Sequence, residues 1–71
     1  MNVVGPQIQI IRQAQGLTQG VAAARCNLIE WPISRGTYAK IESQTRRVTD
    51  EEVLLLAQVF NVSIQELFPP Q

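Results

Sequence analysis

The 71-residue sequence contains no histidine and only one cysteine, Cys26. A single thiol cannot form an internal disulfide, and without histidine it cannot complete a zinc site, so we expect no metal and no cofactor. Cys26 follows a run of alanines and is expected to be a small core residue. Because the sequence offers no histidine and no pair of neighbouring acids suited to proton transfer, we do not expect an enzyme.

Long hydrophobic runs and a net charge are also missing. The longest apolar run is too short to cross a bilayer, and the N-terminus lacks the pattern of a signal peptide. Without disulfides or a membrane segment, the expected location is a reducing cytoplasm. Six basic and six acidic residues give a net charge of zero, which argues mildly against nucleic-acid binding.

The charges are nevertheless segregated along the chain. Residues 34–47 carry four basic residues and one acidic residue, Glu42. Residues 48–71 carry four acidic residues and no basic one. The distribution of charge matters more for binding than its sum, so residues 34–47 are the candidate cationic surface.

The chain has room for one small domain, which we place over residues 1–71. Apolar residues at helical spacing and helix-capping residues predict an all-α bundle of five short helices and no strand. The expected helices cover about 6–15, 18–28, 34–43, 50–60 and a short stretch from Ser63 to the prolines at 69 and 70. Thr18 and Thr49 are expected N-caps, Thr49 in a capping box with Glu52, and Gly16 and Asn61 are expected helix stops. Leu67 and Phe68 are expected to seal the core, although either could face a partner subunit. The expected core is about 6–68, between a loose arm at 1–5 and a short tail at 69–71.

The helix expected over 34–43 carries the most informative pattern. Ser34 can cap its N-terminus, while Tyr38 and Ile41 share one face that can pack inward. The basic and hydroxyl-bearing positions lie on the other side or at the leading end, namely Arg35, Gly36, Thr37 and Lys40. Such a helix is suited to the DNA major groove. The simpler alternative is an amphipathic helix whose charges are merely solvated.

Four stretches, in this order and spacing, also carry a family resemblance: Arg12 with residues 16–19, residues 33–42, Arg46–Arg47 and residues 55–68. Together they make the sequence similar to the helix-turn-helix domain of the phage repressor/Cro (XRE-type) family. The resemblance implies a compact lambda repressor-like DNA-binding fold. It also implies a sequence-specific transcriptional regulator, of the repressor kind, that binds an inverted repeat in double-stranded DNA as a homodimer.

The resemblance further implies a role for each candidate site residue. The positions expected to meet base edges are Ser34, Arg35, Gly36, Thr37 and Lys40. The positions expected to bind backbone phosphates are Thr18, Gln19, Arg46 and Arg47. Arg12 and Glu42 match a pair that forms an internal salt bridge and orients the third helix.

The sequence departs from the family pattern in the turn before the third helix. Ser34 follows Ala23 by eleven residues, so helix two must be longer than usual or residues 27–32 must form a real loop. Ala22 stands where the family has leucine, which thins the core unless Leu28 or Trp31 occupies the space. Gln44 also replaces the usual glycine after helix three.

The enlarged turn and the zero net charge motivate a second hypothesis. In it, the helix-turn-helix scaffold binds another protein, as an antitoxin-like or anti-activator partner. An exposed apolar patch around Trp31 would favour this alternative.

Overall fold

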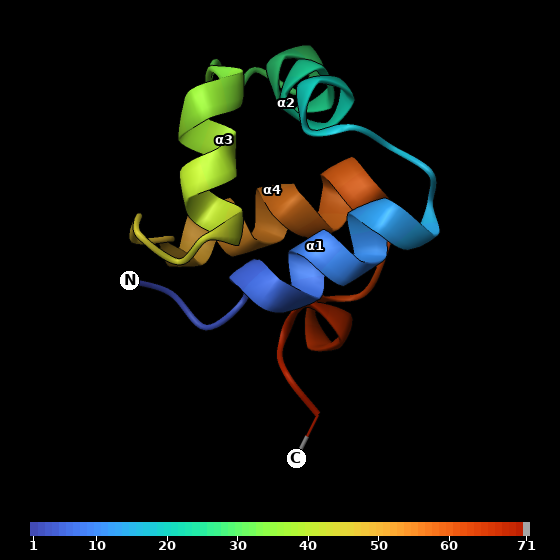
Figure 1. Cartoon of the computed structure of the whole chain (residues 1–71), viewed down its shortest axis with the longest axis vertical. Coiled ribbons are helices and arrows are strands. Elements are labelled where there is room, and N and C mark those ends of the chain that lie inside the picture. The colour runs from blue at the N-terminus through green and yellow to red at the C-terminus, as the bar shows by residue number, and fades with distance from the viewer. Residues whose placement is uncertain (71) are drawn as a thin grey trace.

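In the computed structural model, which describes residues 1–70, four α-helices and one 3-10 turn follow one another without a strand (Figure 1). The elements are α1 (Gly5–Ala14), α2 (Gln19–Leu28), α3 (Arg35–Glu42), α4 (Asp50–Phe60) and the 3-10 turn η1 (Ile64–Leu67). The predicted all-α fold is confirmed. The predicted short fifth helix is present as a four-residue 3-10 turn and not as an α-helix. The last residue of the predicted tail, Gln71, lies outside the described residues.

Three helices begin at a hydroxyl side chain, as their sequences predict. Thr18 accepts a hydrogen bond from the Val21 backbone N–H, and Thr49 forms a capping box with Glu52. Ser34 caps α3 in the same way. These caps satisfy backbone donors that a helix N-terminus leaves unpaired, so they fix where α2, α3 and α4 start.

Each of the four helices is followed by a residue in the left-handed conformation. These residues are Gly16, Glu30, Gln44 and Asn61, with φ of 72°, 64°, 67° and 52°. Glycine and asparagine adopt this conformation readily, and the predicted stops at Gly16 and Asn61 are confirmed. Gln44 takes the same conformation although it has a side chain, so the end of α3 agrees with the family pattern.

The core is formed by side chains from all four α-helices, from η1 and from the loops. Its fully buried large side chains are Val4, Ile8, Cys26, Tyr38, Ile41, Leu56, Phe60 and Leu67. Burial raises the pKa of the Cys26 thiol to about 11, so Cys26 is a core residue as predicted. Phe68, expected to seal the core together with Leu67, is instead 40% exposed.

The turn between α2 and α3 is a true loop, because α2 ends at Leu28 and α3 begins at Arg35. Trp31 folds back from this loop into the core and is only 8% exposed, whereas Leu28 is 83% exposed. Trp31 therefore joins Ala22 in the core. Trp31 itself is therefore not the exposed apolar residue that would have favoured a protein-binding module.

Residues 2–5 are not the loose arm that the sequence suggested. Val4 is buried and Gly5 already belongs to α1. The Asn2 side chain donates hydrogen bonds to the backbone carbonyls of Ile41 and Arg46. The start of the chain is thereby attached to the end of α3.

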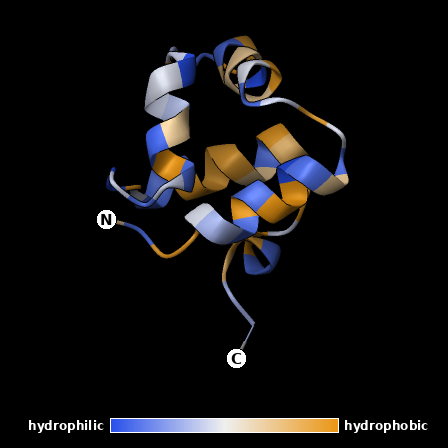
Figure 2. Ribbon diagram, in the orientation of Figure 1, coloured by the Kyte–Doolittle hydropathy of each residue, from blue (hydrophilic) through white to orange (hydrophobic). Residues whose placement is uncertain are grey.

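The elements are ordered along the long axis of the molecule. Figure 1 shows α2 and the start of α3 at one end, η1 and the C-terminus at the other, and α1 and α4 between them. Figure 2 shows the first half of α3 in blue and pale colours and α4 largely in orange, so α3 begins with hydrophilic residues whereas α4 is mainly hydrophobic. No helix within residues 1–70 has the length and apolar content that a membrane span requires.

Candidate nucleic-acid interface

One face of the predicted recognition helix, α3, is exposed. Arg35, Gly36 and Lys40 are exposed, and Thr37 is half-buried. A methyl group added at Gly36 would have only the Ser34 hydroxyl oxygen nearby, at 3.9 Å. The surface at this end of α3 is therefore open, cationic and low in relief, as approach to a groove requires.

The two hydroxyl groups at the start of α3 are used differently. Ser34 Oγ accepts from the Thr37 backbone N–H at 3.1 Å and donates to Thr37 Oγ1 at 3.0 Å. The Ser34 hydroxyl is thus occupied by capping the helix. The Thr37 hydroxyl accepts that bond and keeps its own proton, which is available to an external acceptor.

The N-terminus of α2 lies beside the N-terminus of α3. A Cβ atom built on Gly20 would lie 3.9 Å from Cδ of Arg35. Thr18 accepts a bond from Val21, so its hydroxyl proton can still be donated outward. The first N–H groups of α2 lack partners within the helix, which makes this end suited to a phosphate.

The C-terminal end of α3 is held by a buried carboxylate, that of Glu42. Arg12 donates to it through Nε at 2.6 Å and through Nη2 at 3.1 Å. The Tyr38 hydroxyl and the Gln19 amide donate at 2.5 Å and 3.1 Å. The predicted ion pair between Arg12 and Glu42 is thus present in the structure, within a network that spans α1, α2 and α3.

Glu42 remains charged although it is buried. Burial by itself would raise the pKa of this carboxyl, but the hydrogen bonds from Arg12, Tyr38 and Gln19 outweigh burial, so the pKa is lowered. The same pairing raises the pKa of Arg12. The negative charge of Glu42 is therefore neutralised inside the protein and does not face an approaching phosphate.

Gln19 occupies a position between this network and the surface. Its Nε2 atom donates to Glu42, so the side chain is not free in the way the sequence suggested. A primary amide carries two N–H donors, and only one is needed for Glu42. Gln19 can therefore hold Glu42 and still offer one donor to a phosphate.

The two arginines after α3 differ in their surroundings. Arg46 forms a two-pronged ion pair with Glu52, at 3.0 Å from Nη1 and 2.9 Å from Nη2. This pairing raises the pKa of Arg46 and lowers that of Glu52. Arg47 is exposed and forms no salt bridge within residues 1–70. Of the two arginines predicted to bind phosphates, only Arg47 has no salt-bridge partner within residues 1–70.

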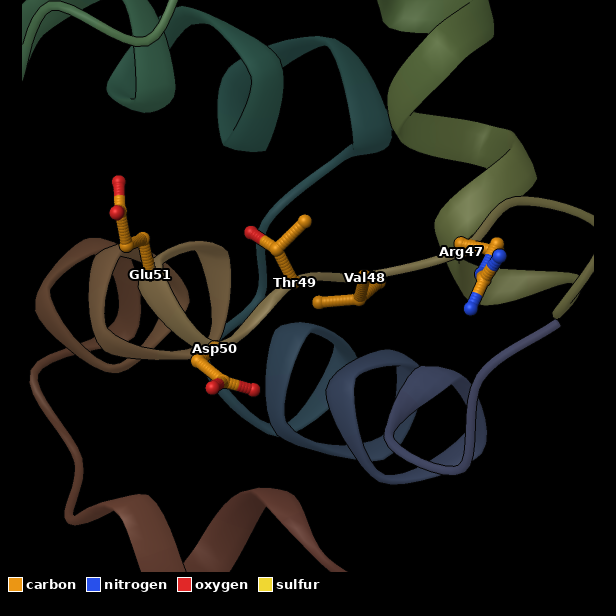
Figure 3. A pocket seen from close by; sticks show the side chains of 5 residues that line it. All are labelled: Arg47, Val48, Thr49, Asp50 and Glu51. Carbon is orange, nitrogen blue, oxygen red and sulfur yellow. The ribbon is translucent and has the colours of Figure 1, made fainter.

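Arg47 also borders a shallow hollow that continues along the start of α4. Its other lining residues are Val48, Thr49, Asp50 and Glu51. Figure 3 shows the Arg47 side chain at one end, apart from the two acidic side chains. Asp50 and Glu51 would repel a phosphate, so the hollow marks the edge of the cationic surface and is not part of it.

The unpaired positive charge is concentrated on one surface. Of six basic residues, Arg12 and Arg46 are in salt bridges within residues 1–70. Three of the remaining four lie on α3 and the loop after it: Arg35, Lys40 and Arg47. A protein with zero net charge thus presents a local cationic face, which we call the α3 face.

Sequence reasoning missed two residues that shape the α3 face. Glu52 was predicted only as part of the capping box, and its pairing with Arg46 was not foreseen. Asn2 was placed in a loose arm, although it contacts the end of α3. Neither contact follows a helical period, because each joins a loop to another element, so no sequence pattern could have identified it.

Comparison with known families agrees with this geometry. A family model described as helix-turn-helix matches residues 8–67, which is most of the chain. The matched part includes α2, α3 and the loop between them. A search of curated proteins and a search of solved structures gave no match.

Proposed function

Since the chain belongs to the XRE/Cro-type helix-turn-helix family, whose domains bind DNA and are not enzymes, we propose that it is a sequence-specific transcriptional repressor. In this proposal α3 enters the major groove of a double-stranded operator. Arg35 and Lys40 donate to acceptors on base edges, with guanine O6 and N7 as the preferred partners of Arg35. Gly36 permits close approach, and Thr37 bonds a base or packs against a thymine methyl.

The observation that carries the proposal is the difference in exposure between two faces of α3. Arg35, Gly36 and Lys40 are exposed, while Tyr38, Ile41 and Glu42, on the other face, are buried. A helix that only covers the core would have no need of an unpaired Arg35 and Lys40 beside an open Gly36. This contrast favours DNA recognition over an amphipathic helix with solvated charges.

Backbone phosphates have their own proposed partners. Thr18, the second N–H of the Gln19 amide and Arg47 can each donate to a phosphate without breaking a bond present in the free protein. Arg46 can do so only by giving up Glu52, so we assign it a smaller contribution. Ser34 is assigned to capping α3 and not to base contact.

A homodimer is part of the proposal. One recognition helix covers a short half-site, and two-fold pairing places two such helices about 34 Å apart on one face of DNA. Exposed apolar side chains on α4 and the C-terminal segment, namely Leu54, Ile64 and Phe68, are available for pairing. The proposed operator is accordingly an inverted repeat. A protein-binding module has less support, because Trp31 is buried.

The test is selection of duplexes from a randomised pool by the purified protein at low salt, followed by sequencing. Enrichment of an inverted repeat is the expected result. The matched control is the double variant Arg35→Ala, Lys40→Ala, which should retain phosphate contacts but enrich nothing. Binding without enrichment by the unmodified protein would contradict sequence-specific recognition, and absence of binding at low salt would contradict the DNA-binding role.

A further inference from the structure

Asn2 forms three hydrogen bonds to the end of α3 and the loop after it, and one to the start of α1. Asn2 Nδ2 donates to the carbonyl oxygens of Ile41 at 3.0 Å and Arg46 at 2.8 Å. Asn2 Oδ1 accepts from the Gly5 N–H at 2.8 Å. The Gln44 amide donates to the Asn2 carbonyl at 2.8 Å. Every polar atom of the Asn2 side chain is therefore engaged.

Gly5 brings the two helices into direct backbone contact. A Cβ atom at Gly5 would lie 2.4 Å from the Ile41 carbonyl oxygen and 2.8 Å from that of Glu42, so no larger residue fits without movement. The last carbonyls of α3 thus face the first turn of α1. The negative end of one helix dipole meets the positive end of another, which favours this contact. We call residues 2–5 the N-terminal anchor.

The anchor holds the part of the chain that carries the loop arginines. The segment after α3 reverses direction at Gln44, and its amides at 45 and 46 bond to the Lys40 carbonyl. Asn2 fixes the carbonyl of Arg46, and the next residue is the unpaired Arg47. Figure 1 shows the N-terminal segment passing beside this loop, drawn in yellow.

We propose that Asn2 is a positioning residue for DNA binding, which holds the end of α3 and the Arg46–Arg47 loop as one surface. This inference rests on the DNA-binding role proposed above. Without Asn2, binding must order the loop at the moment of contact, so affinity falls. Arg35 lies at the opposite end of α3, so the base preference that depends on Arg35 is expected to remain.

A purely local role for Asn2 makes a different prediction, and two variants separate the two roles. Asn2→Ala removes all its side-chain hydrogen bonds. Asn2→Asp keeps the acceptor for the Gly5 N–H, which supports the start of α1, but replaces the two donors with a carboxylate that carbonyl oxygens repel. If Asn2 only starts α1, Asn2→Asp will behave like the unmodified protein.

The control is Gln15→Ala. Gln15 also joins distant parts of the chain through one amide-to-carbonyl bond, to Phe60 at 2.8 Å, but it lies away from α3. Its loss therefore reports a general decrease in stability. All variants are compared at a temperature where each is folded.

Two readouts test the proposal in the full chain. In the free protein, amide hydrogen exchange at residues 44–46 should accelerate in both Asn2 variants and not in Gln15→Ala. With a selected duplex, both Asn2 variants should bind about tenfold more weakly than Gln15→Ala, with the same preference at the base pair assigned to Arg35. The dependence of log K on log salt should flatten by at most about 0.9, the loss of one phosphate contact.

Unchanged exchange at 44–46 in Asn2→Asp, or affinity equal to that of Gln15→Ala, would overturn the proposal. If the unmodified protein binds no duplex, the proposed DNA-binding role fails by itself. The exchange measurement would then still decide whether Asn2 holds the loop.

Discussion

The two ends of α3 differ in burial and in how they are bonded to the rest of the fold. At the C-terminal end, Glu42 is 6% exposed and receives hydrogen bonds from Arg12, Gln19 and Tyr38. At the N-terminal end, Arg35 is exposed and forms no salt bridge within residues 1–70. One end is fixed to α1 and α2, and the other is left open. Rigid attachment of one end lets the other present its side chains in a defined geometry.

The comparison predicts that breaking the fixed end costs stability most. Arg12→Ala removes two bonds to Glu42 and leaves a buried charge without its partner, so the free energy of unfolding should fall by about 3–5 kcal/mol. Urea denaturation followed by circular dichroism measures this loss. Arg25→Ala is the control, because within residues 1–70 the Arg25 side chain donates a single long hydrogen bond, to the Val59 carbonyl at 3.3 Å. A loss no larger than the control's would contradict the structural role of the pair.

Acid should weaken the fixed end without any mutation. The pKa values of Glu42 and Glu52 are lowered from 4.5 in the folded state, so the folded protein binds fewer protons than the unfolded chain. Their contribution is therefore present above about pH 4.5 and is lost as pH falls through the lowered values. Thermal unfolding from pH 7 to pH 3 should show this loss below pH 4.5. In Glu42→Gln the loss should be smaller, and an identical profile would contradict the assignment.

Substitution of Gly36 at the open end should have the opposite effect on stability: the protein should become more stable but bind DNA more weakly. Gly36→Ala replaces a poor helix former where space is available, so the free energy of unfolding should rise by about 1 kcal/mol. The added methyl group would stand between α3 and the groove, so affinity for a selected duplex should fall. Gly36→Ser should lower affinity further. Unchanged affinity in both variants would show that Gly36 does not approach the DNA.

Substitutions in the loop after α3 should have the smallest effect. They should change the salt dependence of DNA binding, and by different amounts for Arg46 and Arg47. Arg47→Ala should reduce the slope of log K against log salt by about 0.9, because one phosphate contact is lost. Arg46→Ala should reduce it less, because Arg46 is paired with Glu52 in the free protein. Binding titrations at several salt concentrations measure both slopes. Equal slopes for the two variants would contradict the difference in pairing.

Most of the fold could be predicted because its signals are local. The hydroxyl caps at Thr18, Ser34 and Thr49 and the stops at Gly16 and Asn61 act within a few residues, and each is found where the sequence placed it. Residues 64–67 form a 3-10 turn and not an α-helix for a similarly local reason. Proline at 69 and 70 leaves room for only one turn after Ser63, and that turn is 3-10.

The candidate site was less predictable where loops meet other elements. The choice of Arg35 and Lys40 depended on helical spacing, and both are exposed as that spacing requires. The sequence left open whether Leu28 or Trp31 fills the space beside Ala22, and the fold of the loop decides for Trp31. The pairing of Arg46 with Glu52 and the contacts of Asn2 depend on how loops fold back in three dimensions. A sequence without an alignment contains no signal for such contacts, so only the structure could supply them.

We propose that the open, N-terminal end of α3 selects the DNA sequence through Arg35. The most direct test of this proposal is the ratio of affinities of Arg35→Ala for a selected duplex and for one with a single guanine replaced, alongside its free energy of unfolding. We expect the difference in binding free energy between the two duplexes to shrink by about 1–3 kcal/mol, while the free energy of unfolding stays unchanged. A ratio equal to that of the unmodified protein, at equal stability, would contradict the assignment of this end of α3 as the sequence-selecting surface.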